Sequence, residues 1–218
     1  MLFRSGKSNA ETNQLLLGLG LSRSDVSTAG LRVLEQLAAE REELTQKLAA
    51  AEDLADRDTL TPTLNRRAFL RELHRTMSEV ERYKSPAAVL YIDLDGFKAL
   101  NDSHGHAAGD AVLRQVGRLL VDQVRESDIV GRLGGDEFGL ILNRAPADEA
   151  RVKAQSLIDK INSCTLVHAG VAHHVRASIG MHAIAIVEDP ETAIARADEA
   201  MYADKHARRA QSATFAAF

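Results

Sequence analysis

Two short stretches of the chain carry side chains that could do chemistry together. In the first, Asp93 and Asp95 end an apolar run, and Lys98 and Asn101 follow. Side chains two positions apart on a strand share a face, so both carboxylates would lie together where a strand ends. Hard divalent cations such as Mg²⁺ prefer oxygen ligands of this kind and also bind substrate phosphates. A strand-end Asp is equally common as a cap or turn residue, so this stretch alone leaves both interpretations open.

The second stretch is Gly134-Gly135-Asp136-Glu137. Glycines let a backbone approach a phosphate closely, and the carboxylates beside them could complete a metal site. By itself a Gly-Gly-Asp sequence is also ordinary turn chemistry. The two stretches together, with Lys98 between them, predict nucleoside triphosphate chemistry that uses Mg²⁺.

Alternating strands and helices must position these residues. Residues 87–94 form a near-continuous apolar run, as expected for a strand covered on both faces. Segments 129–133 and 137–142 flank the Gly-Gly-Asp turn and predict a β-hairpin. This alternation predicts an α/β fold with helices packed on one sheet. The other predicted elements are helices over 62–83 (Thr61 as N-cap, Pro62 as first residue), 97–102, 107–125, 146–161 and 190–206, a strand over 176–186 and an edge strand over 212–218.

The segment before this domain predicts a coiled coil. Residues 31–56 contain no Pro or Gly and many strong helix formers. Arg41 interrupts the apolar seam, which can fix the register of a coil at some cost in stability. We expect a parallel pair of helices; a single amphipathic helix lying on its own domain is the alternative. The seam residues at a/d spacing are Leu34, Leu37, Leu44, Leu48, Ala51 and Ala55.

These patterns divide the chain into three predicted parts: a flexible or docking segment over 1–30, a dimerising coiled-coil helix over 31–57, and the α/β domain over 58–218. The net charge of −4 supplies no general basic field, which argues against nucleic acid as a partner. No apolar run approaches the ~20 residues needed to cross a bilayer. The one cysteine, Cys164, is typical of a reducing compartment. We therefore expect a cytoplasmic protein without a membrane span.

Four groups of residues make the chain similar to one known family. Gly134 to Phe138 spells the signature of the GGDEF, or diguanylate cyclase, family. Residues 58–69, 93–110 and 178–205 resemble its other motifs in order and spacing, so the resemblance covers roughly residues 57 to 210. It implies a palm-like nucleotide-cyclase fold, with a central mainly antiparallel sheet flanked by helices. It also implies condensation of two GTP molecules into cyclic di-GMP with release of two pyrophosphates.

The resemblance also implies roles for individual residues. Asp93, the main-chain carbonyl of Leu94, and Asp136 would hold Mg²⁺, for which Mn²⁺ could substitute. Glu137 would share a second metal ion or act as base. Lys98, Asp136 and Glu137 would be catalytic, with Lys98 stabilising the transition state. The residues expected to contact GTP are Phe97, Lys98, Asn101, His106, Asp110, Gly134, Gly135, Lys205 and Arg209.

Guanine selection falls to Asn101 and Asp110 in this scheme. A carboxylate can accept from the ring N–H and the exocyclic amine of guanine, an arrangement that adenine does not offer. Relatives that also accept ATP carry a smaller residue at the position of Asp110, so Asp favours GTP. His106 would contact substrate or orient the loop, and both interpretations stay open. Each domain would hold one GTP, so turnover needs two domains face to face in a homodimer.

A candidate control site precedes the signature. Arg125 and Asp128 match the family's R-x-x-D inhibitory motif, through which the product cyclic di-GMP would act as an allosteric inhibitor. Arg can bond guanine O6 and N7 as a fork, and Asp can accept from N1 and N2. The alternative is a solvated surface pair. A second Arg that often completes such a site is missing: Ser156 stands near the expected place, with Lys153 and Lys160 close by.

Some positions depart from the family pattern. Pro62, Thr63, Arg208 and Ala210 replace common residues outside the metal and guanine positions, and the last two weaken the assignment of Arg209. Two other functions remain alternatives: a catalytically silent sensor of cyclic di-GMP, or an interaction scaffold that works through the coil. We interpret the remaining histidines as surface or strand residues without metal-ligand spacing; they are His168, His173, His174 and His182.

Overall fold

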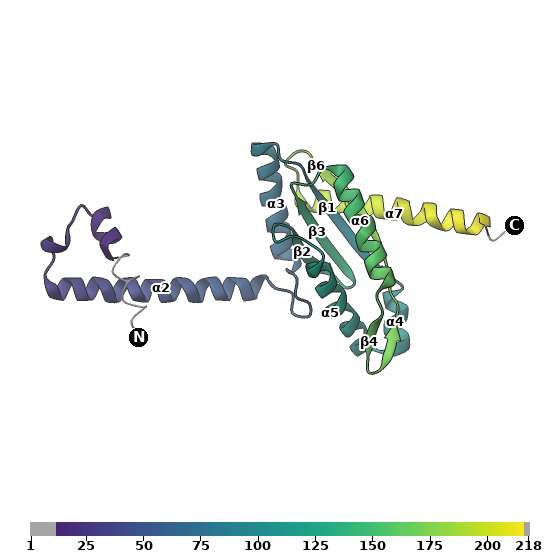
Figure 1. Ribbon diagram of the computed structural model, residues 1–218, viewed down its shortest axis with the longest axis horizontal. Helices are drawn as coiled ribbons and strands as arrows, with labels where there is room; N and C mark the ends of the chain where they lie inside the picture. The colour runs from purple at the N-terminus through teal and green to yellow at the C-terminus, as the bar shows by residue number, and fades with distance from the viewer. Residues whose placement is uncertain (1–11, 216–218) are drawn as a thin grey trace. The chain divides into compact units, whose positions relative to one another are not determined.

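The computed structural model describes residues 12–215, with side chains described as far as Lys205 except that of Leu166 (Figure 1). It separates into two compact units, Met1–Ala55 and Asp56–Phe218. No helix in the described part of the chain has the length and apolarity that a membrane span requires.

The first unit is a helical hairpin. Residues 12–18 are helical, a short 3-10 turn (η1, Arg23–Asp25) follows, and helix α2 runs over Thr28–Asp56. Leu16 is buried, and so is Ala38 on α2. Arg23 donates to Asn13 Oδ1 at 2.8 Å and pairs with Glu35 at 3.2 Å. The predicted long N-terminal helix is therefore confirmed, although it begins a few residues earlier than expected.

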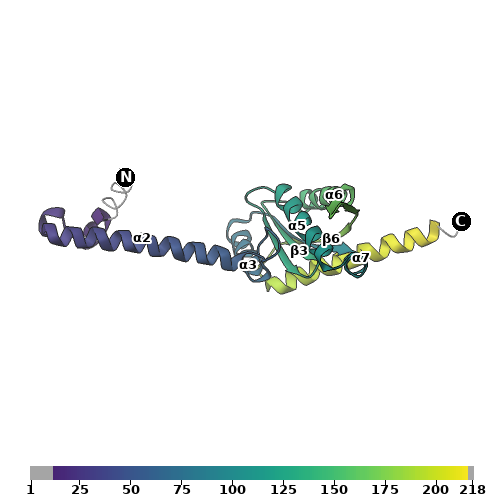
Figure 2. The same cartoon turned by 90° about the horizontal axis from the view of Figure 1, so that it is seen from below.

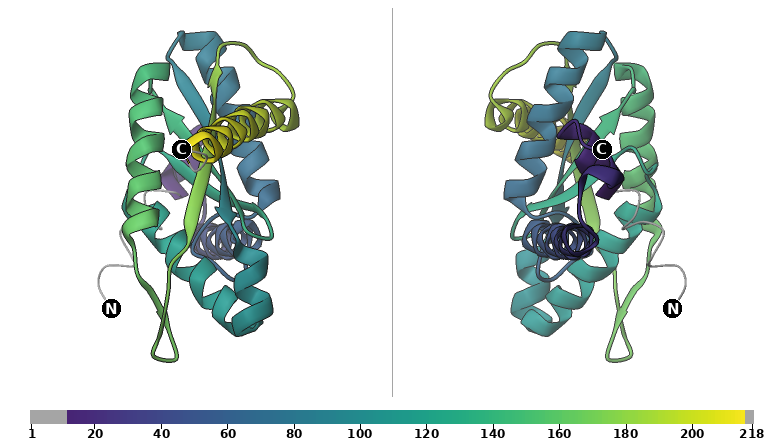
Figure 3. Two further views of the ribbon diagram at one scale, coloured as in Figure 1. Left: turned by 90° about the vertical axis from the view of Figure 1, so that its right-hand side faces the viewer. Right: turned by 90° about the vertical axis from the view of Figure 1, so that its left-hand side faces the viewer.

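The second unit contains a four-stranded sheet. Its strands are β1 (Ala87–Asp95), β2 (Ile129–Gly134), β3 (Glu137–Asn143) and β6 (Arg176–Ile184), in the order β2-β3-β1-β6. Every neighbouring pair is antiparallel. This confirms the predicted α/β fold with a central antiparallel sheet. A separate two-stranded hairpin, β4 (Leu166–His168) with β5 (Val171–His173), projects at one end of the unit (Figure 3) and was not predicted.

Helices cover both faces of the sheet (Figure 2). Helices α3 (Arg66–Tyr83) and α7 (Pro190–Phe215) cover one face, where Phe69, Met77 and Met201 pack on Tyr91 and Ile141. The opposite face packs against the helices that follow β1 and β3, which are α4 (Phe97–His104), α5 (His106–Asp122) and α6 (Ala147–Ser163). Alternate residues of β1 enter the two cores, as the period of a strand requires. The near-continuous apolar run of β1 follows from this double burial.

Glycines let α7 and α3 approach the sheet closely. A Cβ on Gly180 of β6 would lie 1.9 Å from the carbonyl oxygen of Ala197, so α7 can lie on this strand only without a side chain there. Gly139 plays the same part for α3, because a Cβ there would lie 2.5 Å from the ring of Phe69. The sheet therefore fixes the position of the helix that carries Lys205.

The predicted start of the first domain helix was wrong. Helix α3 begins at Arg66 rather than Pro62, and its N-cap is Asn65, whose Oδ1 accepts from Ala68 N at 3.0 Å. Thr61 does not cap a helix, because its backbone N and its hydroxyl both donate to Asp58 Oδ1. Residues 58–64 therefore form a turn, and Leu64 bridges to Gly131 of β2.

The predicted edge strand over 212–218 was also wrong. Helix α7 continues without a break from Pro190 to Phe215, past the predicted end at 206. Residues 207–215 contain no Pro or Gly and several Ala and Arg residues, which favour continuation of a helix. Residues 216–218 lie outside the described part, as do residues 1–11 of the predicted N-terminal segment.

Candidate active site

The candidate site lies where β1 ends. Asp93 and Asp95 alternate with buried Ile92 and Leu94, so both carboxylates lie on the face that α7 covers. The ammonium group of Lys205, on α7, lies 2.7 Å from Asp93 Oδ2 and 2.5 Å from Asp95 Oδ1. Sequence positions more than a hundred residues apart thus meet at one strand end.

The Gly-Gly-Asp turn lies beside this strand end. In the β1–β3 pairing Asp93 is opposite Glu137, so Asp136 is one residue further into the turn. Gly135 has a φ of 27°, a conformation that favours glycine. Arg132 donates to the carbonyl of Gly135 through Nε at 3.0 Å and through a terminal nitrogen at 2.6 Å. The side chain of Arg132, in the strand that leads into the turn, therefore holds the turn in this conformation.

The motif over residues 58–69 braces this turn from outside. Asp58 Oδ1 lies 3.3 Å from a terminal nitrogen of Arg132, which joins the two motifs directly. Arg66, at the start of α3, donates to the carbonyl of Leu133 at 3.3 Å and pairs with Glu191 of α7. The opening motif thus serves the site by position, and the departures at Pro62 and Thr63 lie inside the turn that Asp58 holds.

Like charges crowd the site. Burial raises the pKa of the Asp136 carboxyl, and the charges of Asp93 and Glu137 raise it further. Burial, with Glu137 and Asp93, also raises the pKa of Asp198 on α7. The negative charges of Asp93 and Glu137 thus raise the pKa of both neighbouring carboxyls, so a cation among these groups is favoured.

Two further groups respond to this negative charge. Burial raises the pKa of Tyr91, as does the hydrogen bond between its hydroxyl and Glu137. Burial alone would lower the pKa of Lys205, but its hydrogen bonds to Asp93 and Asp95 outweigh burial and raise it. Lys205 therefore stays charged and partly neutralises the cluster.

The donor set fits a hard divalent cation. Asp93 and Asp136 offer carboxylate oxygens that repel each other, and a cation already lies against Asp93 in the form of Lys205. Within residues 12–215, no three Asp, Glu, His or Cys side chains converge as a finished metal site. Magnesium usually binds through one or two carboxylates together with substrate phosphates, so an incomplete protein cage suits this ion.

The predicted guanine-reading residues lie on α4 and α5, which follow β1 directly. Asn101 Oδ1 is buried and has no hydrogen-bond partner among the described residues. Gly109 makes room for this amide, because a Cβ there would lie 1.9 Å from Asn101 Oδ1. Asp110, one residue on, is half-exposed and lies 3.8 Å from Arg114. Lys98 and His106 are exposed, and the ring of Phe97 is buried beneath α4.

The predicted inhibitory pair lies in the turn after α5. Asp128 accepts from the backbone N of Arg125 at 3.1 Å and from that of Asn143 at 3.2 Å, which holds the turn in shape. The Arg125 side chain is exposed and lines a hollow of about 290 Å³ with Asp128 and Arg57. Lys153 of α6, considered as a substitute for the missing second Arg, donates to the carbonyl of Gln123.

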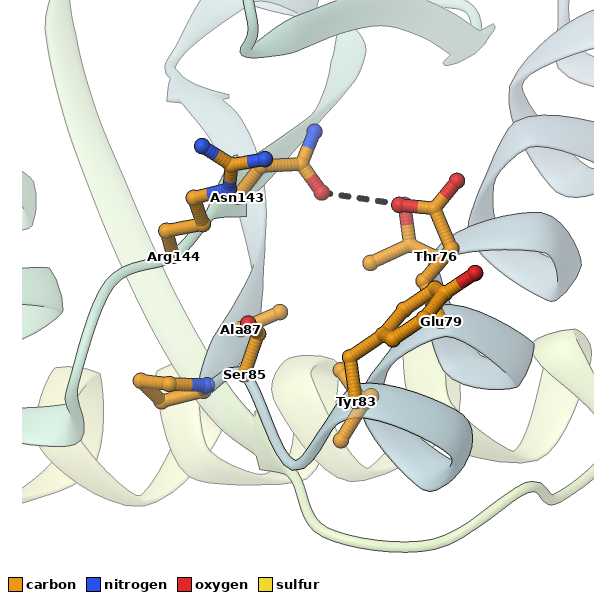
Figure 4. Close-up of a pocket in the computed structure, with 9 residues that line it drawn as sticks. Thr76, Glu79, Tyr83, Ser85, Ala87, Asn143 and Arg144 are labelled. Atoms are coloured by element: carbon orange, nitrogen blue, oxygen red, sulfur yellow. Dashed lines mark hydrogen bonds between the residues drawn. The ribbon is translucent and has the colours of Figure 1, made fainter.

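Another hollow, of about 410 Å³, lies at the opposite end of β1 (Figure 4). Ala87, the first residue of β1, lines it, together with Tyr83 and Arg144. Thr76 and Asn143 close one side through a hydrogen bond of 3.2 Å. Since Asp93 is at the other end of the strand, this hollow is separate from the candidate site.

Comparison with known proteins places the chain in a family. The family described as "Diguanylate cyclase, GGDEF domain" matches residues 55–211. The chain belongs to the GGDEF diguanylate cyclase family. The predicted resemblance is thereby confirmed over nearly the whole of the second unit.

Two curated GGDEF relatives come from Escherichia coli K12. The probable diguanylate cyclase DgcE is 37% identical over 193 residues, covering 87% of this chain and 17% of DgcE. The diguanylate cyclase DosC is 38% identical over 153 residues, covering 70% of this chain and 33% of DosC. The chain thus spans at most about a third of the length of these two relatives.

A solved GGDEF structure extends the likeness to the long helix. The coiled coil and GGDEF domain of DgcB from Caulobacter crescentus, in complex with c-di-GMP, has 28% identity and a TM-score of 0.72. The match covers 81% of this chain and 94% of that one.

Several residues of the site were not singled out from the sequence. Ser178, Tyr91 and Asp198 gained no role there, because nothing in a strand or helix pattern tells which residues face a distant carboxylate. Ser178 and Asp198 lie inside the motif over residues 178–205, which was the available signal, and Asp95 had been considered only as a cation ligand beside Asp93. Arg209 lies on α7, but its side chain is outside the described part.

Proposed function

We propose that this chain is an active, metal-dependent diguanylate cyclase that condenses two GTP molecules into cyclic di-GMP and releases two pyrophosphates. The observation that supports it most is the meeting of Asp93, Lys205 and the Gly-Gly-Asp turn at one strand end. The curated GGDEF relatives DgcE and DosC carry the name diguanylate cyclase.

Asp93, Asp136 and the carbonyl of Leu94 would hold Mg²⁺, or Mn²⁺ in its place. Bound there, the ion would neutralise triphosphate charge and favour ionisation of the attacking hydroxyl. Enzymes of this family are generally metal-dependent, and the mutual repulsion of Asp93 and Asp136 supports a cation at this place.

The rest of the chemistry falls to groups around this ion. A 3′-oxygen of one GTP attacks the α-phosphorus of the other, a P–O bond forms, and pyrophosphate leaves with the electrons of the broken bond. Gly134 and Gly135 let the backbone pass the phosphates, while Lys98 and Lys205 offset their charge. Glu137 takes the hydroxyl proton or supports a second ion, and Arg209 would add a further positive charge.

Guanine would be read between α4 and α5. The buried Oδ1 of Asn101 has no hydrogen-bond partner among the described residues. An N–H group of the base could donate to it. Asp110 would accept from the guanine N1–H and amine. Phe97 would support the floor of this site from below, and His106 would contact the nucleotide or hold the loop.

Two copies must meet for each turnover, because one domain holds one GTP. Exposed Leu37, Leu44 and Leu48 on α2 support a parallel homodimer through residues 31–57, with 58–218 as the catalytic domain. A short link raises the effective concentration of the half-sites to roughly the millimolar range. Product binding at Arg125 and Asp128 would hold two domains apart and inhibit turnover.

The test is direct. Incubated with GTP and Mg²⁺, the protein should release pyrophosphate and form cyclic di-GMP, measured by a coupled phosphate assay and by chromatography. Asp136→Asn removes one charged metal ligand and should reduce turnover at least about a hundredfold. A parent protein that binds cyclic di-GMP but forms none would favour the silent sensor; one that does neither would favour the coiled-coil scaffold.

A further inference from the structure

The ammonium group of Lys205 contacts two carboxylates, and only one of them belongs to the proposed metal ligands. Its Nζ lies 2.7 Å from Asp93 Oδ2 and 2.5 Å from Asp95 Oδ1. All three side chains are about a quarter exposed, but the Asp95 Oδ1 that faces Lys205 is itself buried. Asp93 belongs to the proposed metal ligands, whereas Asp95 has no part in that set.

Asp95 is held independently of Lys205. The hydroxyl of Ser178, a buried residue of β6, donates to Asp95 Oδ2 at 2.9 Å. One carboxylate oxygen thus faces the neighbouring strand and the other faces α7. Ser178 is also directly opposite Asp93 in the β1–β6 register, so the residue that holds Asp95 is the cross-strand partner of a proposed metal ligand.

A metal ion at Asp93 would change this balance. A divalent cation and an ammonium group repel each other strongly at the distance of one shared carboxylate. Lys205 would then lose its contact with Asp93 and keep the one with Asp95. A lysine without this second carboxylate would either compete for Asp93 or turn into solvent.

We propose that Asp95, fixed by Ser178, is a positioning residue that retains Lys205 when metal occupies Asp93. Lys205 serves as a resident cation that neutralises Asp93 in the metal-free protein, and on metal binding it stays beside Asp95, aimed at the triphosphate. The first half of this proposal concerns metal binding alone, and the second half rests on the proposed function.

Metal binding without nucleotide tests the exchange. Mn²⁺ binding to the chain of residues 1–218 is measured at pH 8 by the signal of free Mn²⁺ in electron paramagnetic resonance. Lys205→Met removes the competing cation and should tighten Mn²⁺ binding about tenfold. Lys160→Met removes an equal charge from an exposed site on α6 and should leave Mn²⁺ binding unchanged. Equal or weaker binding by Lys205→Met would overturn the proposal.

A double-mutant cycle tests the part of Asp95. Asp95→Asn keeps an oxygen for Ser178 but loses its charge, which leaves Lys205 to Asp93 alone, so Mn²⁺ binding should weaken several-fold. In the Lys205→Met background most of this weakening should disappear. A weakening of the same size in both backgrounds would mean that Asp95 acts on the metal directly, and the proposal would be wrong.

The GTP arm separates positioning from a purely structural role. Asp95→Asn should raise KM for GTP about tenfold with a smaller change in kcat, Ser178→Ala should do the same more weakly, and neither should act in the Lys205→Met background. Independent effects in that background contradict the proposal. If the parent forms no cyclic di-GMP, the proposed function fails, and the Mn²⁺ measurements still decide the exchange at Asp93.

Discussion

The acidic residues of this site carry more negative charge than the one neighbouring lysine neutralises. Asp93, Asp136, Glu137 and Asp198 lie close enough that burial and mutual repulsion raise the pKa of Asp136 and of Asp198. Lys205 offsets part of this charge. Such a cluster favours a bound cation, and under the proposed function the triphosphate would need its metal ion to approach these carboxylates.

Asp110 provides a prediction about base selection. Asp110→Ser removes the acceptor for guanine N1–H and the amine, and should lower the preference for GTP over ATP about ten- to hundredfold. Initial rates with each nucleotide, alone and in competition, measure this preference. Asp122→Ser, at the exposed end of α5, is the matched control. Unchanged discrimination against ATP by Asp110→Ser would remove the assignment.

Arg125 provides a prediction about feedback. Arg125→Ala removes the fork for guanine O6 and N7 while its backbone N can still donate to Asp128, so the turn should survive. Product inhibition should disappear and the initial rate should stay the same. Progress curves with added cyclic di-GMP measure both, with Arg82→Ala, which removes an exposed arginine of α3 away from this hollow, as the control. A variant inhibited like the parent would refute the site.

The sequence predicted the members of the site better than their contacts. Asp93, Asp136 and Lys205 could be named because motifs fix spacing along the chain, and the structure brings Lys205 to Asp93. Their partners could not, since Ser178 and Asp198 reach the site only through strand pairing and the path of α7. Motif spacing is local, whereas the electrostatics of a site depend on the fold.

Whole elements in this domain depend on close backbone approach. Helix α7 lies on β6 at Gly180, and α3 places Phe69 against Gly131 and Gly139. A substituted side chain at any of these positions would push a helix away from the sheet. Because α7 carries Lys205, the distance between α7 and the sheet also determines how closely Lys205 approaches Asp93.

Gly180→Ala tests this dependence. The added methyl would lie 1.9 Å from a main-chain oxygen, which cannot rotate away. We expect a loss of at least about 1–3 kcal/mol in the free energy of unfolding, measured by urea denaturation. Ala183→Val adds methyls at an exposed position of the same strand and should stay within about 0.5 kcal/mol of the parent. Equal stability of the two variants would contradict the packing described.

Element types were predicted more reliably than element ends. Each long periodic segment formed the expected strand or helix. The start of α3 was predicted wrongly from Thr61 and Pro62, because the Thr61 hydroxyl bonds to Asp58 and does not cap a helix. The short β4–β5 hairpin was missed, since three-residue strands give too brief a pattern. Local competition for hydrogen bonds decides such boundaries.

At the scale of the whole molecule, a helical unit precedes the GGDEF domain. Exposed leucines on α2 lie on the predicted seam, and the related DgcB structure is described as a coiled coil with a GGDEF domain. The apolar area of this seam gains stability only when a second helix covers it. Turnover should therefore depend on the association of two chains.

Charged residues in the seam test that dependence. Leu44→Lys combined with Leu48→Lys should make specific activity fall steeply as the protein is diluted, with a monomer in sedimentation velocity. Ala39→Lys combined with Gln46→Lys adds the same charge at exposed positions off the seam and should behave like the parent. Specific activity that is independent of protein concentration in the seam variant would defeat the proposal.

The strand order has a consequence for synthesis on the ribosome. β1 pairs with β6, and the ammonium group beside Asp93 comes from residue 205, so the acidic strand end is completed by segments that follow α6 in the chain. A nascent chain that has emerged only through α6 holds Asp93 and Asp136 but lacks Ser178 and Lys205. At that stage the acidic strand end would lack the cation that offsets its charge, and the proposed site would be complete only after β6 has paired with β1 and α7 has followed.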